Sequence, residues 1–199
     1  MAERKKSSTK KKIEVSTKEI VKVEPIVEES KVLKVKKCFN RILNDEARHL
    51  YTPVIKELFE VAPDILERKI PDANVQQAFI LDTVRHFTPK NGSILGVGTF
   101  DDTAWEVLVR QHSDEYTLVG VDPNYGTDLN SEWTNSKQKY DMIFATSVIE
   151  HVPDDLLFIR QMVDLLKPGG VITLTADYHP NYYPGMTIVP GLSRFYTEN

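Results

Sequence analysis

Two glycines and an aspartate are the residues whose spacing points most clearly to chemistry. Gly96 and Gly98 lie at the end of a short apolar run, and Asp122 ends the next such run. Glycine lets a backbone turn tightly and approach a ligand closely. An acid about 20 residues after such a turn is placed to accept both hydroxyls of an adenosine ribose. The same residues also fit a tight strand-to-helix turn and a cap on the turn that follows Asp122. We favour a nucleotide-cofactor site and leave these structural alternatives open.

Two further aspartates, Asp101 and Asp102, stand where a helix is expected to begin after the glycine turn. A dinucleotide would set its pyrophosphate on this helix end, where each contact with a carboxylate would cost on the order of 1 kcal/mol or more. Asp101 also takes the position at which a third glycine would allow close phosphate approach. A positively charged sulfonium cofactor without phosphate tolerates the same acids. The charge pattern therefore disfavours NAD and FAD.

His151 is the best-placed residue for acid–base catalysis, because it lies just past the third predicted strand. It also fits a residue that caps the next helix or packs beside a ligand. His179, after the fourth predicted strand, is a weaker candidate, and Tyr182 and Tyr183 fit either an acceptor pocket or packing. The five histidines lack the paired spacing of metal ligands, so we predict no metal site.

Apolar strands that alternate with amphipathic helices would position these residues. We predict strands over 93–97, 117–122, 140–146 and 171–175, helices over 44–61, 74–87, 102–111 and 153–166, and a turn at 167–170. This alternation predicts an α/β fold with a doubly wound, mostly parallel sheet that is covered by helices on both faces.

Four segments of the sequence resemble the class I S-adenosylmethionine-dependent methyltransferases of the "methyltransferase domain 11" type. They are 94–98 (Ile-Leu-Gly-Val-Gly), 118–122 (Leu-Val-Gly-Val-Asp), 140–152 and 165–172. The last two are the most specific, because an aspartate before an apolar strand, then Glu-His, then Leu-Lys-Pro-Gly-Gly follow in the family's order. The resemblance covers about half of the chain.

The resemblance implies a Rossmann-like sheet of seven strands that binds S-adenosylmethionine. It sets the glycine turn around the methionine part of the cofactor, Asp122 on the ribose, residues 128 and 129 near the adenine, and Thr146 beside the cofactor. The cofactor-binding residues that it implies are Gly96, Val97, Gly98, Asp122, Asp128, Leu129 and Thr146.

The sequence departs from the family pattern in two places. Gly96 replaces the usual acid of the glycine loop, while Phe100 and Asp102 replace two glycines. This variant loop resembles that of methyltransferases from surface-polysaccharide gene clusters. Residues 179–199 are too interrupted by proline and glycine for the two strands that the family would add, so we expect a C-terminally incomplete domain, with a partner chain as one way to complete the sheet.

These features predict an S-adenosylmethionine-dependent methyltransferase that acts on a small molecule, with O-methylation of a sugar or polysaccharide precursor as the expected reaction and His151 as the base. The altered glycine loop and the early end favour one alternative, a catalytically inactive methyltransferase-like domain that binds a partner. A nicotinamide dehydrogenase is the third interpretation, and the charge pattern speaks against it.

Composition divides the chain into three parts. Residues 1–37 carry a net charge of +6 and read as a disordered Lys/Glu-rich tail. We expect 38–90 to be a helical segment packed on the sheet, and 91–199 to be the cofactor-binding domain. Together, residues 38–199 carry a net charge of −10. That acidic body argues against a nucleic-acid partner. A single cysteine and the absence of a membrane-spanning apolar run or a signal peptide favour a cytoplasmic protein.

Overall fold

The computed structural model describes residues 39–188 and 190–197. The predicted tail, residues 1–37, lies outside them. The helices are α1 (Asp45–Val61), α2 (Pro63–Leu66), α3 (Ala73–Phe87), α4 (Thr103–His112), α5 (Leu129–Asn135) and α6 (Asp155–Leu165), with a short 3-10 helix η1 (Pro123–Tyr125). The strands are β1 (Ser93–Val97), β2 (Thr117–Val121), β3 (Tyr140–Thr146) and β4 (Leu166–Thr175).

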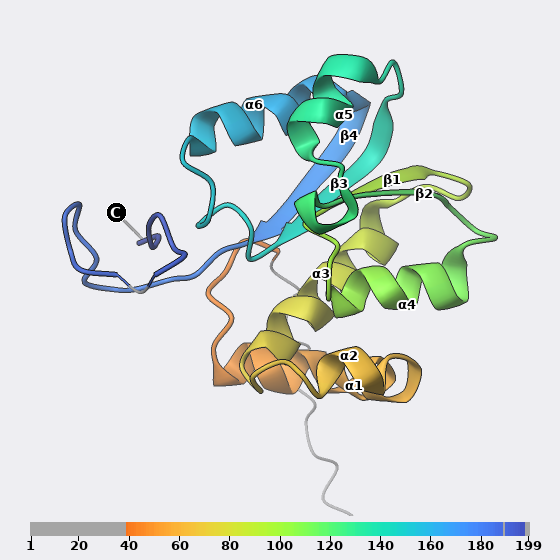
Figure 1. Cartoon of the computed structure of the whole chain (residues 1–199). Helices are drawn as coiled ribbons and strands as arrows, with labels where there is room; N and C mark the ends of the chain where they lie inside the picture. The colour runs from red at the N-terminus through yellow and green to blue at the C-terminus, as the bar shows by residue number, and fades with distance from the viewer. Residues whose placement is uncertain (1–38, 189, 198–199) are drawn as a thin grey trace, which may run out of the picture. The chain divides into compact units, whose positions relative to one another are not determined.

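The four strands form one parallel sheet in the order β2-β1-β3-β4 (Figure 1). Leu95 of β1 lies opposite Val119 of β2 on one side and Ile143 of β3 on the other. The chain runs from β1 to β2 and then crosses back to β3, so the strand order reverses between β1 and β3. This confirms the predicted doubly wound sheet, although the described residues form four strands of the seven that the resemblance implies.

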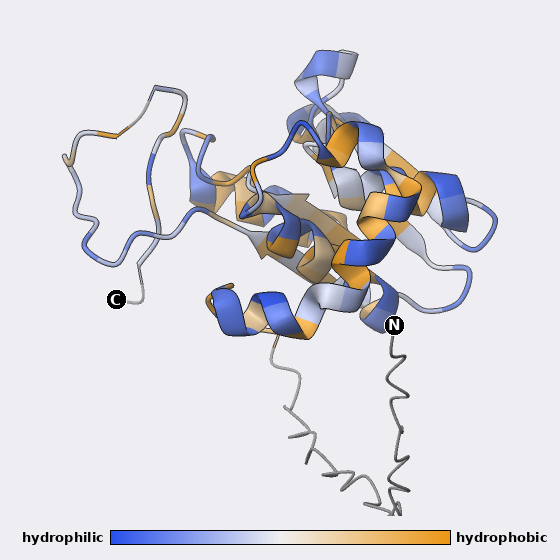
Figure 2. Ribbon diagram, turned by 90° about the horizontal axis from the view of Figure 1, so that it is seen from below, coloured by the Kyte–Doolittle hydropathy of each residue, from blue (hydrophilic) through white to orange (hydrophobic). Residues whose placement is uncertain are grey.

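The two faces of the sheet are covered by different helices. Figure 1 shows α5 and α6 on one side of the sheet and α1, α3 and α4 on the other. Ile94 and Phe144 pack in a core with α1, α3 and α4, whereas Leu95 and Ile143 pack in a second core with α6. Side chains alternate between the faces of a strand, so a short apolar strand fills both cores. Figure 2 shows hydrophilic residues beside hydrophobic ones along the helices, as this two-sided packing requires.

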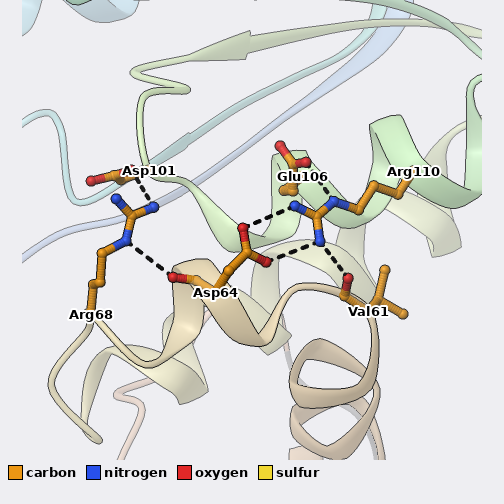
Figure 3. Close-up of polar contacts among 6 residues, drawn as sticks. All are labelled: Val61, Asp64, Arg68, Asp101, Glu106 and Arg110. Atoms are coloured by element: carbon orange, nitrogen blue, oxygen red, sulfur yellow. Dashed lines mark hydrogen bonds and ion pairs between the residues drawn. The ribbon is translucent and has the colours of Figure 1, made fainter.

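An ion-pair network fastens the N-terminal helices to α4 (Figure 3). The guanidinium of Arg110 donates to both carboxylate oxygens of Asp64 at 3.0 and 3.1 Å, and to the Val61 carbonyl oxygen at 2.7 Å. Its Nε donates to Glu106 one helical turn earlier, at 2.6 Å. The network therefore connects the end of α1 and the start of α2 to the C-terminal half of α4.

Most predicted elements are observed within one or two residues of their predicted bounds. Two α-helices and the 3-10 helix η1 were not predicted: α2 spans 4 residues, and α5 spans 7 residues that are largely polar. A turn was predicted at 167–170, but these residues lie within β4, as a bulge between Leu166, which is opposite Tyr140, and Val171, which is opposite Met142. A shift in register before Met142 accommodates the Pro-Gly-Gly sequence, in which Gly169 has a φ of +80°.

Candidate active site

The turn after β1 uses its two glycines differently. Gly98 has a φ of +75°, and its N–H donates to the Val121 carbonyl oxygen at 2.8 Å. A Cβ on Gly98 would come 2.4 Å from Cγ2 of Val148, and a Cβ on Gly96 would come 2.8 Å from the Trp105 ring of α4. Gly98 thus meets the needs of a turn next to β3, while Gly96 lets α4 pack close to the sheet.

The backbone N–H groups at the N-terminus of α4 are hydrogen-bonded by side chains of the protein itself. Asp102 is the N-cap and accepts from the Trp105 N–H at 2.7 Å. Gln77 of α3 accepts from the Ala104 N–H at 2.7 Å and donates to the Asp102 carboxylate at 3.1 Å. Burial raises the pKa of Asp102, and the hydrogen bonds from Trp105 and Gln77 offset part of this rise. A pyrophosphate would have to compete with Asp102 and Gln77 for these N–H groups, which adds a geometric reason against a dinucleotide.

Asp101 is part of a second contact between the N-terminal helices and the site (Figure 3). Its carboxylate forms an ion pair with Arg68 at 2.8 Å, while Nε of Arg68 donates to the Asp64 carbonyl oxygen at 3.1 Å. Asp101 has a φ of +56°, a conformation that non-glycine residues rarely adopt. The ion pair therefore holds the loop after β1 in a strained conformation and neutralises one of its two acids.

Asp122 lies at the end of β2 and is only 5% exposed. One of its carboxylate oxygens accepts from the Phe100 N–H at 3.0 Å, and the other accepts from the backbone and side-chain nitrogens of Asn124, both at 2.8 Å. Both sequence interpretations of Asp122 are thus compatible, because the same carboxylate caps its own turn and faces the glycine loop. Beside it, the exposed rings of Phe100 and Tyr125 meet edge to face with centroids 5.7 Å apart.

The other predicted cofactor residues lie at or after the carboxyl ends of the strands. Val97 and Leu129 are buried in the core beside α6, and Asp128 is the exposed N-cap of α5, where hydrogen bonds from Ser131 lower the pKa of its carboxyl. Thr146 ends β3 and adjoins the buried Asp102. The structure thus brings Gly98, Asp122 and Thr146 to one end of the sheet. Their contacts with a cofactor stay predictions.

His151 is exposed and lies against the C-terminal segment. Its Nδ1 is 2.7 Å from the Gly191 carbonyl oxygen, and because a carbonyl only accepts, Nδ1 carries the hydrogen and Nε2 is left as the proton acceptor of the neutral ring. Ser193 donates through its hydroxyl to the His151 carbonyl oxygen at 3.2 Å. His179 lies further along this segment, where its Nδ1 accepts from the Asn181 N–H at 3.2 Å.

A cavity of about 790 Å³ opens beside the carboxyl ends of β3 and β4. Gln76 of α3 and Thr175 of β4 line it, and both contact Ser147, the residue that follows Thr146 and has a φ of +51°. The cavity thus adjoins the end of the sheet that holds the predicted cofactor residues. Four aromatic residues line it, namely Phe39, Phe79, Tyr178 and Tyr196, whereas neither His151 nor His179 does.

Sequence reasoning missed two acidic residues beside this cavity. Glu150 is completely buried, and its Oε1 accepts from the Asp177 N–H at 3.2 Å, while its Oε2 has no hydrogen-bond partner among the described residues. Burial raises the pKa of Glu150, and the charge of Asp177 raises it further. Asp177 lines the cavity itself. The apolar strand before Glu150 was a signal of its burial, but nothing in the sequence placed Asp177 beside it.

Parts of this sequence are similar to known methyltransferases. Residues 70–183 match the model of a family described as "Methyltransferase domain". A ubiquinone biosynthesis O-methyltransferase of Azorhizobium caulinodans is 29% identical over 69 residues, which is 35% of this chain and 26% of that protein. One of the same name from Ruegeria pomeroyi is 30% identical over 77 residues, which is 38% of this chain and 30% of that protein. The chain thus spans less than a third of the length of these relatives.

A crystal structure of coclaurine N-methyltransferase bound to N-methylheliamine and SAH was also matched. It has a TM-score of 0.37 and 12% identity over 68% of this chain and 52% of that chain.

The domain is of the class I S-adenosylmethionine-dependent methyltransferase type. The family match covers more than half of the residues, and the chain belongs to the methyltransferase domain family. Among the described residues, no helix is long and apolar enough to cross a membrane. Within the same residues, no cluster of three or more acidic, histidine or cysteine side chains is arranged to hold a metal ion.

Proposed function

We propose that this protein transfers a methyl group from S-adenosylmethionine to an oxygen atom of a small molecule. The observation that carries the proposal is the position of the cavity, because Ser147 joins its wall to the strand end that holds Thr146. In open α/β sheets ligands bind beyond the carboxyl ends of the strands where their order reverses. A cofactor at the reversal between β1 and β3 and an acceptor in the cavity would then be neighbours.

The residues around the β1 and β2 ends fit an adenosine-containing cofactor. Asp122 has about four acceptor positions, of which three are filled by Phe100 and Asn124. One ribose hydroxyl can donate to Asp122 without other change, and a second would displace the Asn124 side-chain amide. When bound, the cofactor supplies an electrophilic methyl group on a sulfonium. The protein's own contribution is to hold the acceptor oxygen in line with that methyl group, and such alignment is worth up to about 7–11 kcal/mol.

The acceptor is a hydroxyl compound with a ring of modest size. Cavities of about 300–1,000 Å³ hold small molecules, and the cavity here falls in that range with aromatic side chains in its wall. A sugar is the acceptor proposed from the loop resemblance, while the names of the relatives favour a compound of ubiquinone biosynthesis that is methylated on oxygen. Either acceptor must lose a proton, which a base of the site has to take.

Calorimetric titration with S-adenosylhomocysteine tests the cofactor part of the proposal. We expect micromolar binding by the full chain and at least about tenfold weaker binding by Asp122→Ala, since a lost hydrogen bond to a charged group costs about 1.5–3 kcal/mol. Asp114→Ala, an exposed acid in the turn after α4, serves as the matched control and should bind as the wild type does. Absence of binding at millimolar ligand would instead support the inactive, partner-binding alternative.

A further inference from the structure

The wall of the cavity contains few groups that could take a proton from an acceptor. Among the described residues that line it, the carboxylates belong to Asp72 and Asp177, and none is a histidine. The remaining titratable side chains of the wall are Arg41 and the phenols of Tyr178 and Tyr196. An arginine does not release its proton in proteins, so the two carboxylates are the natural candidates for a base.

The two carboxylates differ in how close they lie to the predicted cofactor. The side chain of Asp72 is 90% exposed and forms an ion pair with Arg48 at 2.9 Å, which places it at the rim of the cavity. Asp177 comes two residues after Thr175, whose register partner across the sheet is Thr146. It is half-buried, and no ion pair joins it to another residue in the described ranges. Asp177 is therefore the carboxylate that adjoins the predicted position of the cofactor.

Asp177 lies against the buried carboxyl group of Glu150. The two groups are neighbours, since the Asp177 N–H donates to Glu150. Burial raises the pKa of Glu150, and the charge of Asp177 raises it further, while hydrogen bonds from the backbone and the charge of His151 oppose this rise. Glu150 is completely buried, whereas Asp177 is half-buried and lines the cavity, so Asp177 is the carboxylate of this pair that an acceptor in the cavity can reach. The Asp177 backbone is also fixed, because its carbonyl oxygen accepts from the Tyr196 N–H at 2.9 Å.

We propose that Asp177 is the general base for a hydroxyl acceptor held in this cavity, an inference that rests on the proposed methyl transfer. A carboxylate oxygen of Asp177 takes the hydroxyl proton while the acceptor oxygen forms a bond to the methyl carbon. Breaking of the bond between methyl carbon and sulfur leaves its electron pair on the sulfur. The products are a methyl ether, neutral S-adenosylhomocysteine and protonated Asp177, which returns its proton to water. His151, outside the cavity wall, is not the base in this scheme.

Steady-state kinetics of four full-length proteins tests the assignment. Wild type, Asp177→Asn, His151→Gln and the control Asp114→Asn are assayed with S-adenosylmethionine and either catechol or methyl glucoside, and the methylated product is measured by mass spectrometry. We expect Asp177→Asn to lower kcat by about 10²–10⁴-fold, to change KM little, and to remove the acidic limb of the pH profile of kcat. His151→Gln should lower kcat much less, and Asp114→Asn not at all.

Carbon-13 NMR of labelled carboxyl groups gives a reading that needs no turnover. With S-adenosylhomocysteine bound, we expect catechol or methyl glucoside to shift the Asp177 signal, while the Asp72 signal changes less. An Asp177 signal unmoved by both probes, or a loss of kcat in His151→Gln that Asp177→Asn does not share, overturns the assignment. Failure of the wild type to bind S-adenosylhomocysteine is a different result, because it overturns the proposed methyl transfer itself.

Discussion

Replacing Gln77 by leucine tests how the start of α4 is held. The substitution keeps the volume of a side chain that is 4% exposed and removes both of its hydrogen bonds. The Ala104 N–H then lacks an acceptor, which costs about 1–3 kcal/mol, and Asp102 loses a hydrogen bond worth about 1.5–3 kcal/mol. We expect a loss of about 3 kcal/mol in the free energy of unfolding, and a Tm lower by about 6–12 °C for a domain of this size.

Urea unfolding followed by circular dichroism measures this change, with the m-value as a check on two-state behaviour. Gln111→Leu is the matched control, because Gln111 lies near the end of α4 and is exposed, and its change should stay within about 0.5 kcal/mol. Gln77→Glu sharpens the test. It sets a carboxylate against Asp102, so the variant should be less stable at pH 7 than at pH 5, where the pair can take up a proton. A loss below about 0.5 kcal/mol in Gln77→Leu would refute the described cap.

Three further predictions concern the turn, the helix network and the buried acid. Gly98→Ala should lower the free energy of unfolding by about 1–3 kcal/mol in urea titrations, because its φ is +75° and its Cβ would meet Val148. Arg110→Ala should lower Tm at low salt, and 1 M salt should shrink the difference from wild type by screening the exposed pair with Asp64. For Glu150, burial raises the pKa in the folded state above its ordinary 4.5. The free energy of unfolding of the wild type should therefore fall as pH rises above about that value. Glu150→Gln should flatten this decline when urea unfolding is measured over a range of pH.

The strands of this fold were predictable because parallel strands covered on both faces are continuous apolar runs. Residues 93–97 and 140–146 show such runs, and the structure has strands with these bounds. The helix α5 was missed because its sequence is polar and short, and its signals are the capping Asp128 and one buried residue, Leu129. The prediction of a turn at 167–170 differs from the structure for another reason. Leu166 already pairs with β3, so the proline and glycines that follow form a bulge within β4.

The site was predictable only as far as local sequence determines it. Asp122 and Gly98 could be found because strand ends are visible in the sequence and parallel strands bring their carboxyl ends together. Gln77 could not be found, since its partners lie 25 and 27 residues away and depend on how α3 packs against α4. The same holds for Asp177, whose position beside Glu150 follows from the path of the chain after β4.

The left-handed backbone at Asp101 and Ser147 limits which residues can replace them. Such a conformation costs a non-glycine residue about 1–3 kcal/mol, and both positions border the predicted cofactor site. Valine, isoleucine or threonine would be poorly tolerated at either position because their branched Cβ clashes in this region. Glycine would relieve the strain but would remove the carboxylate that binds Arg68 or the hydroxyl that contacts Gln76. A library of substitutions selected for thermal stability alone should therefore enrich glycine at 101 and 147, and a library selected for cofactor binding should not.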